Sequence, residues 1–220
     1  MNDTLAVNSS APEHELPALY MLRGRNATVE DAIPPEYEVL PLPTRRWHDA
    51  RAVVELDGPV TDRAWGDLLA RVLPGGLFVL RDRRSGQFIG TAIAIDNPAG
   101  SRFYFPAGGQ LGYLVVDAAH RGKGLGYALV VAVVERFRTA GYQHLWLGVQ
   151  GWRLAAIRTY LRAGYRPFLH APNTNALVTR WTCVFAAAGL TADVTTWPRA
   201  LPSSADQAAQ QIVVTGAAVV

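Results

Sequence analysis

The spacing of apolar residues along the chain predicts a mixture of strands and helices. Short stretches that alternate or are continuously apolar are typical of strands, and HLWLGV at 144–149 has the length and content of a buried strand. Apolar residues three and four positions apart are typical of helices, as in LVVAVVERF at 129–137. The pattern predicts strands at 18–24, 37–42, 77–82, 87–95, 110–116, 144–149 and 165–170, and helices at 44–56, 61–73, 124–140, 153–163 and 176–189.

Capping and turn residues divide these stretches from one another. Thr44 and Thr61 are expected N-caps, because a threonine hydroxyl can accept from the free amides at the start of a helix. Gly58-Pro59 and Gly141 are expected to stop helices, and RRSG at 83–86 is typical of a hairpin turn. The order of elements indicates an α/β fold in which a central mixed sheet is flanked by helices.

The two ends of the chain differ in composition from its middle. Residues 1–17 are polar and small, and we expect a flexible N-terminal tail there. Beyond about Thr191 the chain is rich in Ala, Ser and Gln, and 191–220 is expected to be a C-terminal tail. The apolar stretch at 212–220 could also dock on the rest of the protein. The part between, 18–190, is expected to form a single domain.

Composition narrows the classes of function. No apolar run in the 220 residues approaches the roughly 18 of a membrane span, and the N-terminal stretch lacks the pattern of a secretory signal. The single cysteine, Cys183, allows no internal disulfide and fits a reducing, cytoplasmic compartment. The net charge of +3 suits a small molecule that carries phosphate and is too weak to indicate nucleic acid. The five histidines show no metal-ligand spacing, so we expect no metal. From the apolar runs and the net charge we likewise expect neither a membrane nor a nucleic-acid partner.

The sequence RGKGLG at 121–126 stands between a predicted strand and a predicted helix. A helix start leaves amide hydrogens unpaired and carries partial positive charge, and two cations add to it here. This combination suits a pyrophosphate, although a tight strand–helix junction with two solvated cations is the alternative. The spacing fits neither a nucleotide P-loop nor the dinucleotide-binding glycine pattern.

Two segments then resemble one family. Arg121-x-x-Gly124-x-Gly126, preceded by LVV at 114–116, resembles the acyl-CoA-binding motif of the GNAT (GCN5-related) N-acetyltransferases. Downstream, AAIRTYLRAGY at 155–165 is similar to a second segment of that family. The residues that carry this second match are Ala156, Tyr160, Gly164 and Tyr165.

The resemblance is strongest over 77–168, which we take as the motif-bearing core of the domain, and the element order extends it back to residue 37. It implies an acyl-CoA N-acyltransferase fold with acetyl-CoA as co-substrate. The pantetheine arm would pair with the strand backbone, and the Val116 amide would hold the oxyanion of the reacting carbonyl. The resemblance implies coenzyme-binding residues Leu114, Val115, Val116, Arg121, Gly122, Lys123, Gly124, Leu125 and Gly126.

The resemblance also implies a catalytic residue. Tyr160 matches the family's tyrosine and is the expected general acid, whereas packing of an amphipathic helix is the other interpretation. The general base is left unassigned, because Gln110 stands where many relatives have glutamate and cannot take a proton. Histidine is a common general base, but His120 and His144 are expected to be structural. Arg153 replaces an asparagine of many relatives, and could bind a substrate carboxylate or a coenzyme phosphate, or be solvated.

Aromatic residues offer a candidate acceptor pocket. The loop at 102–109 contains FYF between two predicted strands, and Trp146 and Trp152 flank a strand, although core packing also accounts for the tryptophans.

Three interpretations of function stay open at this point. The first is an N-acetyltransferase that acts directly, in a ternary complex, on a primary amine of a small molecule or peptide. The second is a non-catalytic acyl-CoA-binding module of the same fold, and the third is a nucleotide-dependent enzyme. Whether the chain forms a homodimer is left open.

Overall fold

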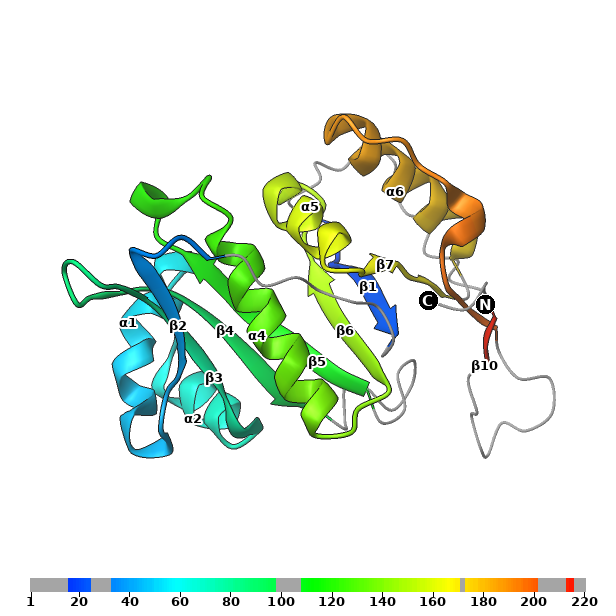
Figure 1. Cartoon of the computed structure of the whole chain (residues 1–220). Helices are drawn as coiled ribbons and strands as arrows, with labels where there is room; N and C mark the ends of the chain where they lie inside the picture. The colour runs from blue at the N-terminus through cyan, green and yellow to red at the C-terminus, as the bar shows by residue number, and fades with distance from the viewer. Residues whose placement is uncertain (1–15, 25–32, 98–107, 171–172, 202–212, 216–220) are drawn as a thin grey trace.

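Seven strands form a single mixed sheet in the computed structural model of the chain (Figure 1). The structure describes residues 16–24, 33–97, 108–170, 173–201 and 213–215. In spatial order the strands of this sheet are β2 (Tyr37–Pro41), β3 (Val72–Asp82), β4 (Phe88–Asp96), β5 (Gly108–Val116), β6 (His144–Val149), β1 (Leu19–Gly24) and β7 (Arg166–Pro167).

One neighbouring pair of strands in this sheet is parallel, and the other pairs are antiparallel. From β2 to β5 neighbouring strands are antiparallel, β5 and β6 are parallel, and β1 is antiparallel to both of its neighbours. Helix α4 (Leu125–Thr139) connects β5 to β6, as expected for a crossover between parallel strands. The expected α/β fold with a mixed sheet is confirmed.

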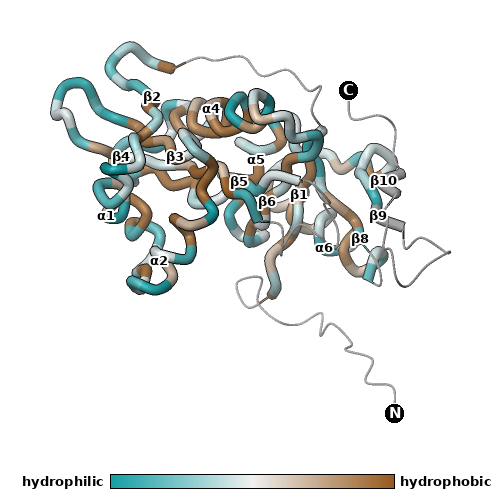
Figure 2. Tube along the Cα trace, turned by 90° about the horizontal axis from the view of Figure 1, so that it is seen from below, coloured by the Kyte–Doolittle hydropathy of each residue, from teal (hydrophilic) through white to brown (hydrophobic). Residues whose placement is uncertain are grey.

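Helices cover both faces of the sheet, and Figure 2 shows apolar strands between α4 and α2. The larger core lies under α4 and α5 and includes Leu129, Phe137 and Ile157, each with no exposed surface. The smaller core lies on the opposite face, where Trp65 and Leu68 pack on β3 and β4. The helices are η2 (Thr44–Ala50), α1 (Arg51–Val54), η3 (Glu55–Asp57), α2 (Asp62–Leu69), η4 (Ala118–His120), α4 (Leu125–Thr139), α5 (Leu154–Arg162), α6 (Thr174–Ala187) and η5 (Val194–Thr196).

The strand nearest the N-terminus lies inside the sheet rather than at its edge. Strand β1 pairs along its whole length with β6 and through Met21 and Leu22 with β7. Arg23 is 2% exposed, and its Nε donates to the carbonyl oxygen of Ala163 at 2.8 Å. This bond satisfies a carbonyl at the C-terminal end of α5, where helices leave such groups unpaired. The first described strand therefore fixes the position of α5.

The first two predicted helices differ from the structure in part. The segment expected to be one helix at 44–56 is divided into η2, α1 and η3, and Pro43 occupies the N-cap position, so the predicted Thr44 cap is wrong. Thr61 does cap α2, since its hydroxyl accepts from the Ala64 amide at 3.2 Å. Helix α2 ends at Leu69 because Val72 already pairs with Ile95 in the sheet, and this tertiary pairing overrides local helical spacing.

The segment after 170 contains more regular structure than helix α6 alone. Strands β8 (Leu169–His170), β9 (Arg199–Leu201) and β10 (Val213–Thr215) form a second, three-stranded sheet. Strand β10 belongs to the apolar stretch at 212–220 for which docking was one alternative. Most of the aromatic loop at 102–109, as well as residues 1–15, lies outside the described residues.

No helix in the described ranges of the chain is long and apolar enough to cross a membrane. No group of three or more His, Cys, Asp or Glu side chains that could hold a metal ion occurs in the same ranges.

Candidate active site

Strands β5 and β6 separate after a short stretch of pairing. They are paired only from Gly108 to Gln110 on β5 and from His144 to Trp146 on β6. Beyond Gln110, β5 continues to Val116 with β4 as its strand partner among the described elements. The end of β5 therefore presents one backbone edge that no described strand covers, in the middle of the sheet.

The Val116 amide lies on this uncovered edge. Backbone groups of successive residues in a strand point to opposite sides. The Asp117 amide donates to the Ile89 carbonyl on the β4 side at 2.7 Å, so the preceding amide, that of Val116, points away from β4. This N–H is available to an extended ligand or to a carbonyl oxygen.

A β-bulge bends β5 just before this edge. Among the described non-glycine residues, Tyr113 has a positive φ, of +52°. The pairing of β4 with β5 shifts register between Thr91 and Ile93. Such a bulge leaves one residue unpaired and turns the strand. It redirects the last three residues of β5, which sequence analysis assigned to the pantetheine arm. Nothing in the sequence predicted the bulge, because tyrosine has no preference for positive φ.

The glycine turn after β5 forms an open cradle at the start of α4. Gly122 and Gly124 have φ +81° and +78°, and a Cβ at either position would meet no atom within 4 Å. Gly124 is the N-cap of α4, and the Tyr127 amide donates to its carbonyl at 3.0 Å. The amides of Leu125 and Gly126 precede this first bond, so they are the groups that a helix start leaves for an anion.

The basic side chains of the turn have distinct positions. Arg121 is exposed, and its Nε donates to the Val116 carbonyl at 2.9 Å, so this side chain joins the turn to the uncovered edge of β5. Glycine conformation, open space, helix amides and Arg121 fit a pyrophosphate group. The predicted residues at 114–116 and 121–126 are thus adjacent in the fold.

Lys123 reaches toward β2. Its Nζ donates to the Tyr37 hydroxyl at 2.7 Å and lies 5.3 Å from the centre of that ring. The same hydroxyl forms a hydrogen bond with His120 Nδ1, 3.2 Å away. The hydrogen bond with Tyr37 raises the pKa of Lys123 and keeps it charged. His120 therefore has a structural partner, and Lys123 connects the turn to the far edge of the sheet.

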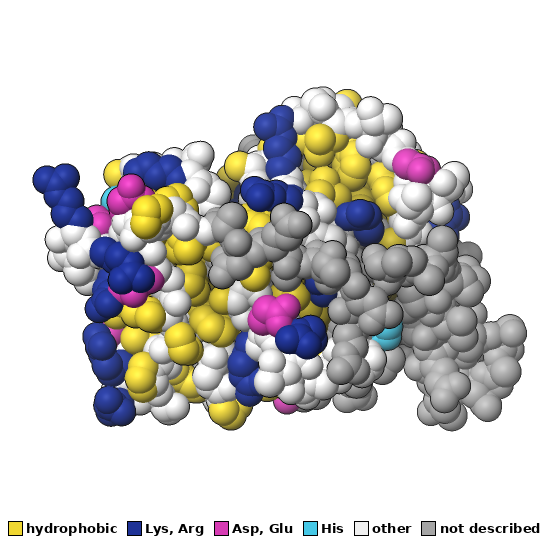
Figure 3. Space-filling model, viewed as in Figure 1, with side chains coloured by type: hydrophobic (Ala, Val, Ile, Leu, Met, Phe, Trp, Pro, Cys, Tyr) yellow, Lys and Arg dark blue, Asp and Glu magenta, His cyan; other side chains and the backbone are white. Residues whose placement is uncertain are grey.

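Arginine and lysine gather on the β2 and β3 side of the molecule, with acidic side chains among them (Figure 3). Glu38 of β2 forms ion pairs with Arg81 and with Arg83, the latter at 2.9 Å. One carboxylate of β2 therefore pairs with two of these arginines.

Tyr160 lies on α5 and is 7% exposed. Burial raises the pKa of its phenol above the ordinary value, while the nearby Arg153 charge lowers it and the Asp57 charge raises it. Its ring meets that of Tyr165 edge to face, with centroids 6.0 Å apart. The phenol is therefore protonated at neutral pH, as the role of an acid or hydrogen-bond donor requires.

The two buried tyrosines predict alkaline instability. Burial raises the pKa of both Tyr160 and Tyr165 above the value of about 10 that they have in the unfolded chain. Above that pH these two groups lose protons in the unfolded chain and retain them in the folded chain. Together they should lower the free energy of unfolding by about 2.7 kcal/mol per pH unit. Urea unfolding from pH 9 to about 11.5 measures the slope. Tyr165→Phe should make the slope shallower by about 1.4 kcal/mol per pH unit, and an unchanged slope would contradict this assignment.

An ion pair joins the start of α5 to the η3 turn. Arg153 Nη1 lies 2.7 Å from Oδ1 and 2.9 Å from Oδ2 of Asp57, a residue 96 positions away in sequence. The Arg153 guanidinium also lies 4.7 Å from the ring centre of Trp152, which is 51% exposed. The sequence left the role of Arg153 open, and the place of Asp57 before Gly58 indicated only the end of a helix.

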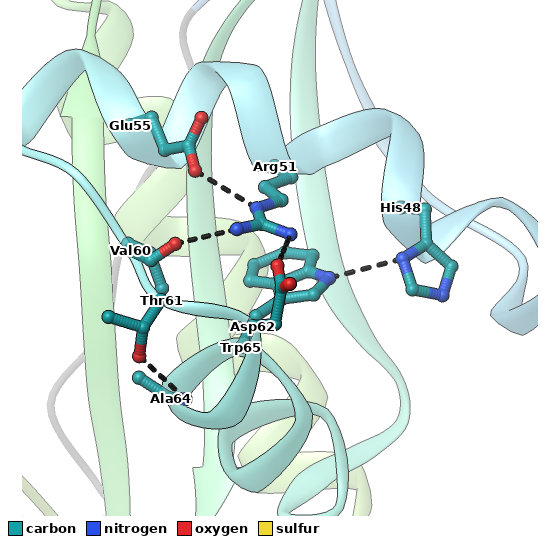
Figure 4. Close-up of polar contacts among 8 residues, drawn as sticks. All are labelled: His48, Arg51, Glu55, Val60, Thr61, Asp62, Ala64 and Trp65. Atoms are coloured by element: carbon teal, nitrogen blue, oxygen red, sulfur yellow. Dashed lines mark hydrogen bonds and ion pairs between the residues drawn. The ribbon is translucent and has the colours of Figure 1, made fainter.

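Arg51 holds the loop that carries Asp57 (Figure 4). Its guanidinium donates to Glu55 at 2.9 Å, to the Val60 carbonyl at 2.7 Å and to Asp62 at 2.6 Å. These partners lie on both sides of Asp57 in sequence, so one side chain joins the two ends of the loop. Asp57 is therefore presented by a preorganised turn rather than by a free loop.

Two further polar groups lie on the strands around β5 and β6. The Gln150 side-chain oxygen, one residue beyond β6, is buried and accepts no hydrogen bond within the described structure. A buried acceptor without a partner is costly, so a hydrogen-bond donor placed there would stabilise this oxygen. Gln110, by contrast, accepts from Asn97 Nδ2 at 2.7 Å. The general base stays unassigned.

Comparison with known proteins agrees with this geometry. Residues 37–165, more than half of the chain, match the family model described as "Acetyltransferase (GNAT) family". Among curated proteins the chain is 27% identical over 126 residues to the uncharacterized N-acetyltransferase YobR of Bacillus subtilis (strain 168). That match covers 57% of this chain and 47% of the Bacillus protein.

Solved structures confirm the expected fold. A GCN5-related N-acetyltransferase from Sphaerobacter thermophilus superposes with a TM-score of 0.57 at 20% identity, covering 69% of this chain and 48% of that one. A glucosamine N-acetyltransferase region in a fungal multi-domain β-N-acetylglucosaminidase gives 0.52 at 12% identity, covering 70% and 20%. The chain thus spans about half the length of the Bacillus and Sphaerobacter proteins.

Proposed function

Because this chain belongs to the GNAT family of acetyltransferases, we propose that it transfers the acetyl group of acetyl-CoA to a primary amine within a ternary complex. The observation that carries the proposal is the open glycine cradle at the start of α4, placed directly beside the uncovered edge of β5. A pyrophosphate and an extended amide-bearing arm are the ligand parts that these two features suit.

The coenzyme would be held mainly by backbone groups. The amides from Gly122 to Gly126 and the Arg121 side chain would bind the pyrophosphate. The backbone of Leu114, Val115 and Val116 would pair with the pantetheine amides as an added strand does. Lys123 adds positive charge near the turn from its position on Tyr37.

Acetyl-CoA supplies an activated carbonyl and a thiol leaving group. The chain's residues would orient the two reactants, which provides much of the rate of such a transfer. The Val116 amide would donate to the carbonyl oxygen as negative charge develops there. The acceptor's ammonium first gives one proton to water, and the neutral nitrogen then forms a bond to the carbonyl carbon. The carbon–sulfur bond breaks, the electron pair leaves on sulfur, and the second surplus proton of the nitrogen also goes to water.

Tyr160 would donate to the departing sulfur. Its raised pKa keeps the phenol protonated over the working pH range. An ordinary cysteine thiol has a pKa of about 8.5, below that of the Tyr160 phenol. The phenol therefore stabilises the departing sulfur chiefly by hydrogen bonding as negative charge develops on it. Water then restores any proton that is transferred.

The proposal is tested by calorimetric titration of the chain with acetyl-CoA and, separately, with ATP and NAD. We expect saturable binding of acetyl-CoA and much weaker binding of the two nucleotides. Comparable binding of ATP would support a nucleotide-dependent enzyme instead. Absence of acetyl-CoA binding would overturn the assignment of the turn and of every coenzyme-binding residue.

A further inference from the structure

The ion pair between Asp57 and Arg153 lies at the start of the helix that carries the proposed catalytic tyrosine. Arg153 is the N-cap residue of α5, and Tyr160 follows it by about two turns, so the two lie on the same face of the helix. Asp57 ends η3, which contacts β5, the strand with the uncovered edge. The pair therefore joins the start of α5 to a turn that packs against β5. Both charges also act on the pKa of the Tyr160 phenol, which Arg153 lowers and Asp57 raises.

A ligand can exchange with this pair when it replaces both partners. The Arg153 side chain is 32% exposed and that of Asp57 46%, so both charges can be reached from water. An ion pair with this exposure contributes little to stability, so its opening opposes ligand binding only weakly. A ligand that offers only an ammonium satisfies Asp57 and leaves Arg153 unpaired, and a ligand that offers only a carboxylate does the reverse.

We propose that the acceptor is an α-amino acid, whose carboxylate binds Arg153 and whose amine lies against Asp57. This inference rests on the proposed acetyl transfer and names the class of its acceptor. The two side chains touch each other, so the two groups that replace them must be adjacent in the ligand. An amine and a carboxylate on a single carbon meet that condition, and the guanidinium fork matches a carboxylate in shape.

Neighbouring groups favour a small polar ligand at this place. Gln150 belongs to the same turn as Arg153, whose amide donates to the Gln150 backbone carbonyl at 3.0 Å. The Gln150 side-chain oxygen is a buried acceptor without a partner in the described structure, and a hydrogen of a ligand bound at this turn would satisfy it. Arg51 holds the Asp57 loop at both ends, so little ordering is required when the ligand binds. Half-exposed Trp152 supports the guanidinium from one side.

The decisive experiment compares matched acceptors by thiol release from acetyl-CoA. The panel consists of the common L-amino acids, their carboxamides and the corresponding amines that lack the carboxyl group. We expect wild type to prefer amino acids, and Arg153→Met to lower the ratio of kcat/KM for amino acid over carboxamide by at least about tenfold. Comparing this ratio between variants cancels the different basicity of the amines. Arg153→Lys, which keeps the charge without the fork, should lower it less.

Arg138→Met is the matched control. Arg138 pairs with Glu135 at 2.7 Å on an exposed face of α4, so its loss removes a similar ion pair away from the site. Arg138→Met should leave the ratio of kcat/KM for amino acid over carboxamide unchanged. The double variant Asp57→Arg/Arg153→Asp keeps an ion pair with its polarity reversed, and it should fold yet lose the preference for amino acids.

A binding measurement separates recognition from turnover. Amino acids are titrated into the chain in the presence of coenzyme A, which carries no acetyl group to transfer. We expect wild type to bind an amino acid more tightly than its carboxamide, and Arg153→Met to lose the difference.

The failures of the two proposals are distinguishable. Equal use of amines that lack a carboxyl group, or no transfer to any amino acid by a chain that binds acetyl-CoA, would overturn the acceptor class alone. Absence of acetyl-CoA binding would overturn the proposed function itself.

Discussion

Replacing Gly124 by leucine is expected to lower the affinity for coenzyme A by at least about a hundredfold while the fold survives. Gly124 has φ +78° at the N-cap of α4, and the space where its Cβ would stand is open. In the proposed complex that space holds the pyrophosphate. A side chain there blocks the helix amides, and loss of two hydrogen bonds to a charged group gives this magnitude.

Gly86 provides the matched control for backbone strain. It has φ +74° in the hairpin turn between β3 and β4, and a Cβ there would also meet no atom within 4 Å. Leucine at either position should lower the free energy of unfolding by a similar amount, about 1–2 kcal/mol. Calorimetric titration with coenzyme A should show loss of binding for Gly124→Leu only. Unchanged affinity in that variant would contradict the position of the pyrophosphate.

Replacing Tyr160 by phenylalanine is expected to lower kcat about a hundredfold with little change in affinity for acetyl-CoA. General acid catalysis contributes about 10²–10⁴-fold, and a thiolate is already a fair leaving group, so we expect the lower end. The ring is retained, and its edge-to-face contact with Tyr165 persists. Steady-state kinetics with a saturating acceptor, together with calorimetric titration, measures both quantities.

Tyr165→Phe is the control for removal of a buried hydroxyl. The Tyr165 hydroxyl is buried and has no hydrogen-bond partner in the described structure, so its loss should be neutral or stabilising. Turnover should be unchanged. An equal loss of kcat in both variants would mean that the packing of α5, rather than the Tyr160 hydroxyl, supports the reaction. Full activity of Tyr160→Phe would exclude the donor role.

Local patterns predicted most of the elements. Strand β6 matches its predicted bounds at 144–149, and α4 and α5 differ from prediction by one residue at each end. These elements have strong periodicity and clear glycine stops, which are local properties of the chain. The glycine turn was found for the same reason, because its spacing and its place between a strand and a helix are visible in sequence.

The relations between distant residues were not predictable from the sequence. The insertion of β1 between β6 and β7, the Lys123–Tyr37 contact and the Asp57–Arg153 pair each depend on how remote segments pack together. Apolar periodicity shows which face of an element is buried but not which partner covers it. The η3 turn that carries Asp57 looked only like the end of a helix, so half of the candidate acceptor site was missed. The domain boundaries at 18–190 stay a prediction.

The most direct test of the central claim measures both products of one reaction. The chain is incubated with acetyl-CoA and an amine acceptor, free thiol is followed with time, and the acceptor is analysed by mass spectrometry. The proposed function predicts one N-acetylated acceptor for each thiol released, with negligible thiol release when the acceptor is left out. Binding of acetyl-CoA without acetylation of any amine would contradict it, and would identify the chain as a non-catalytic acyl-CoA-binding module.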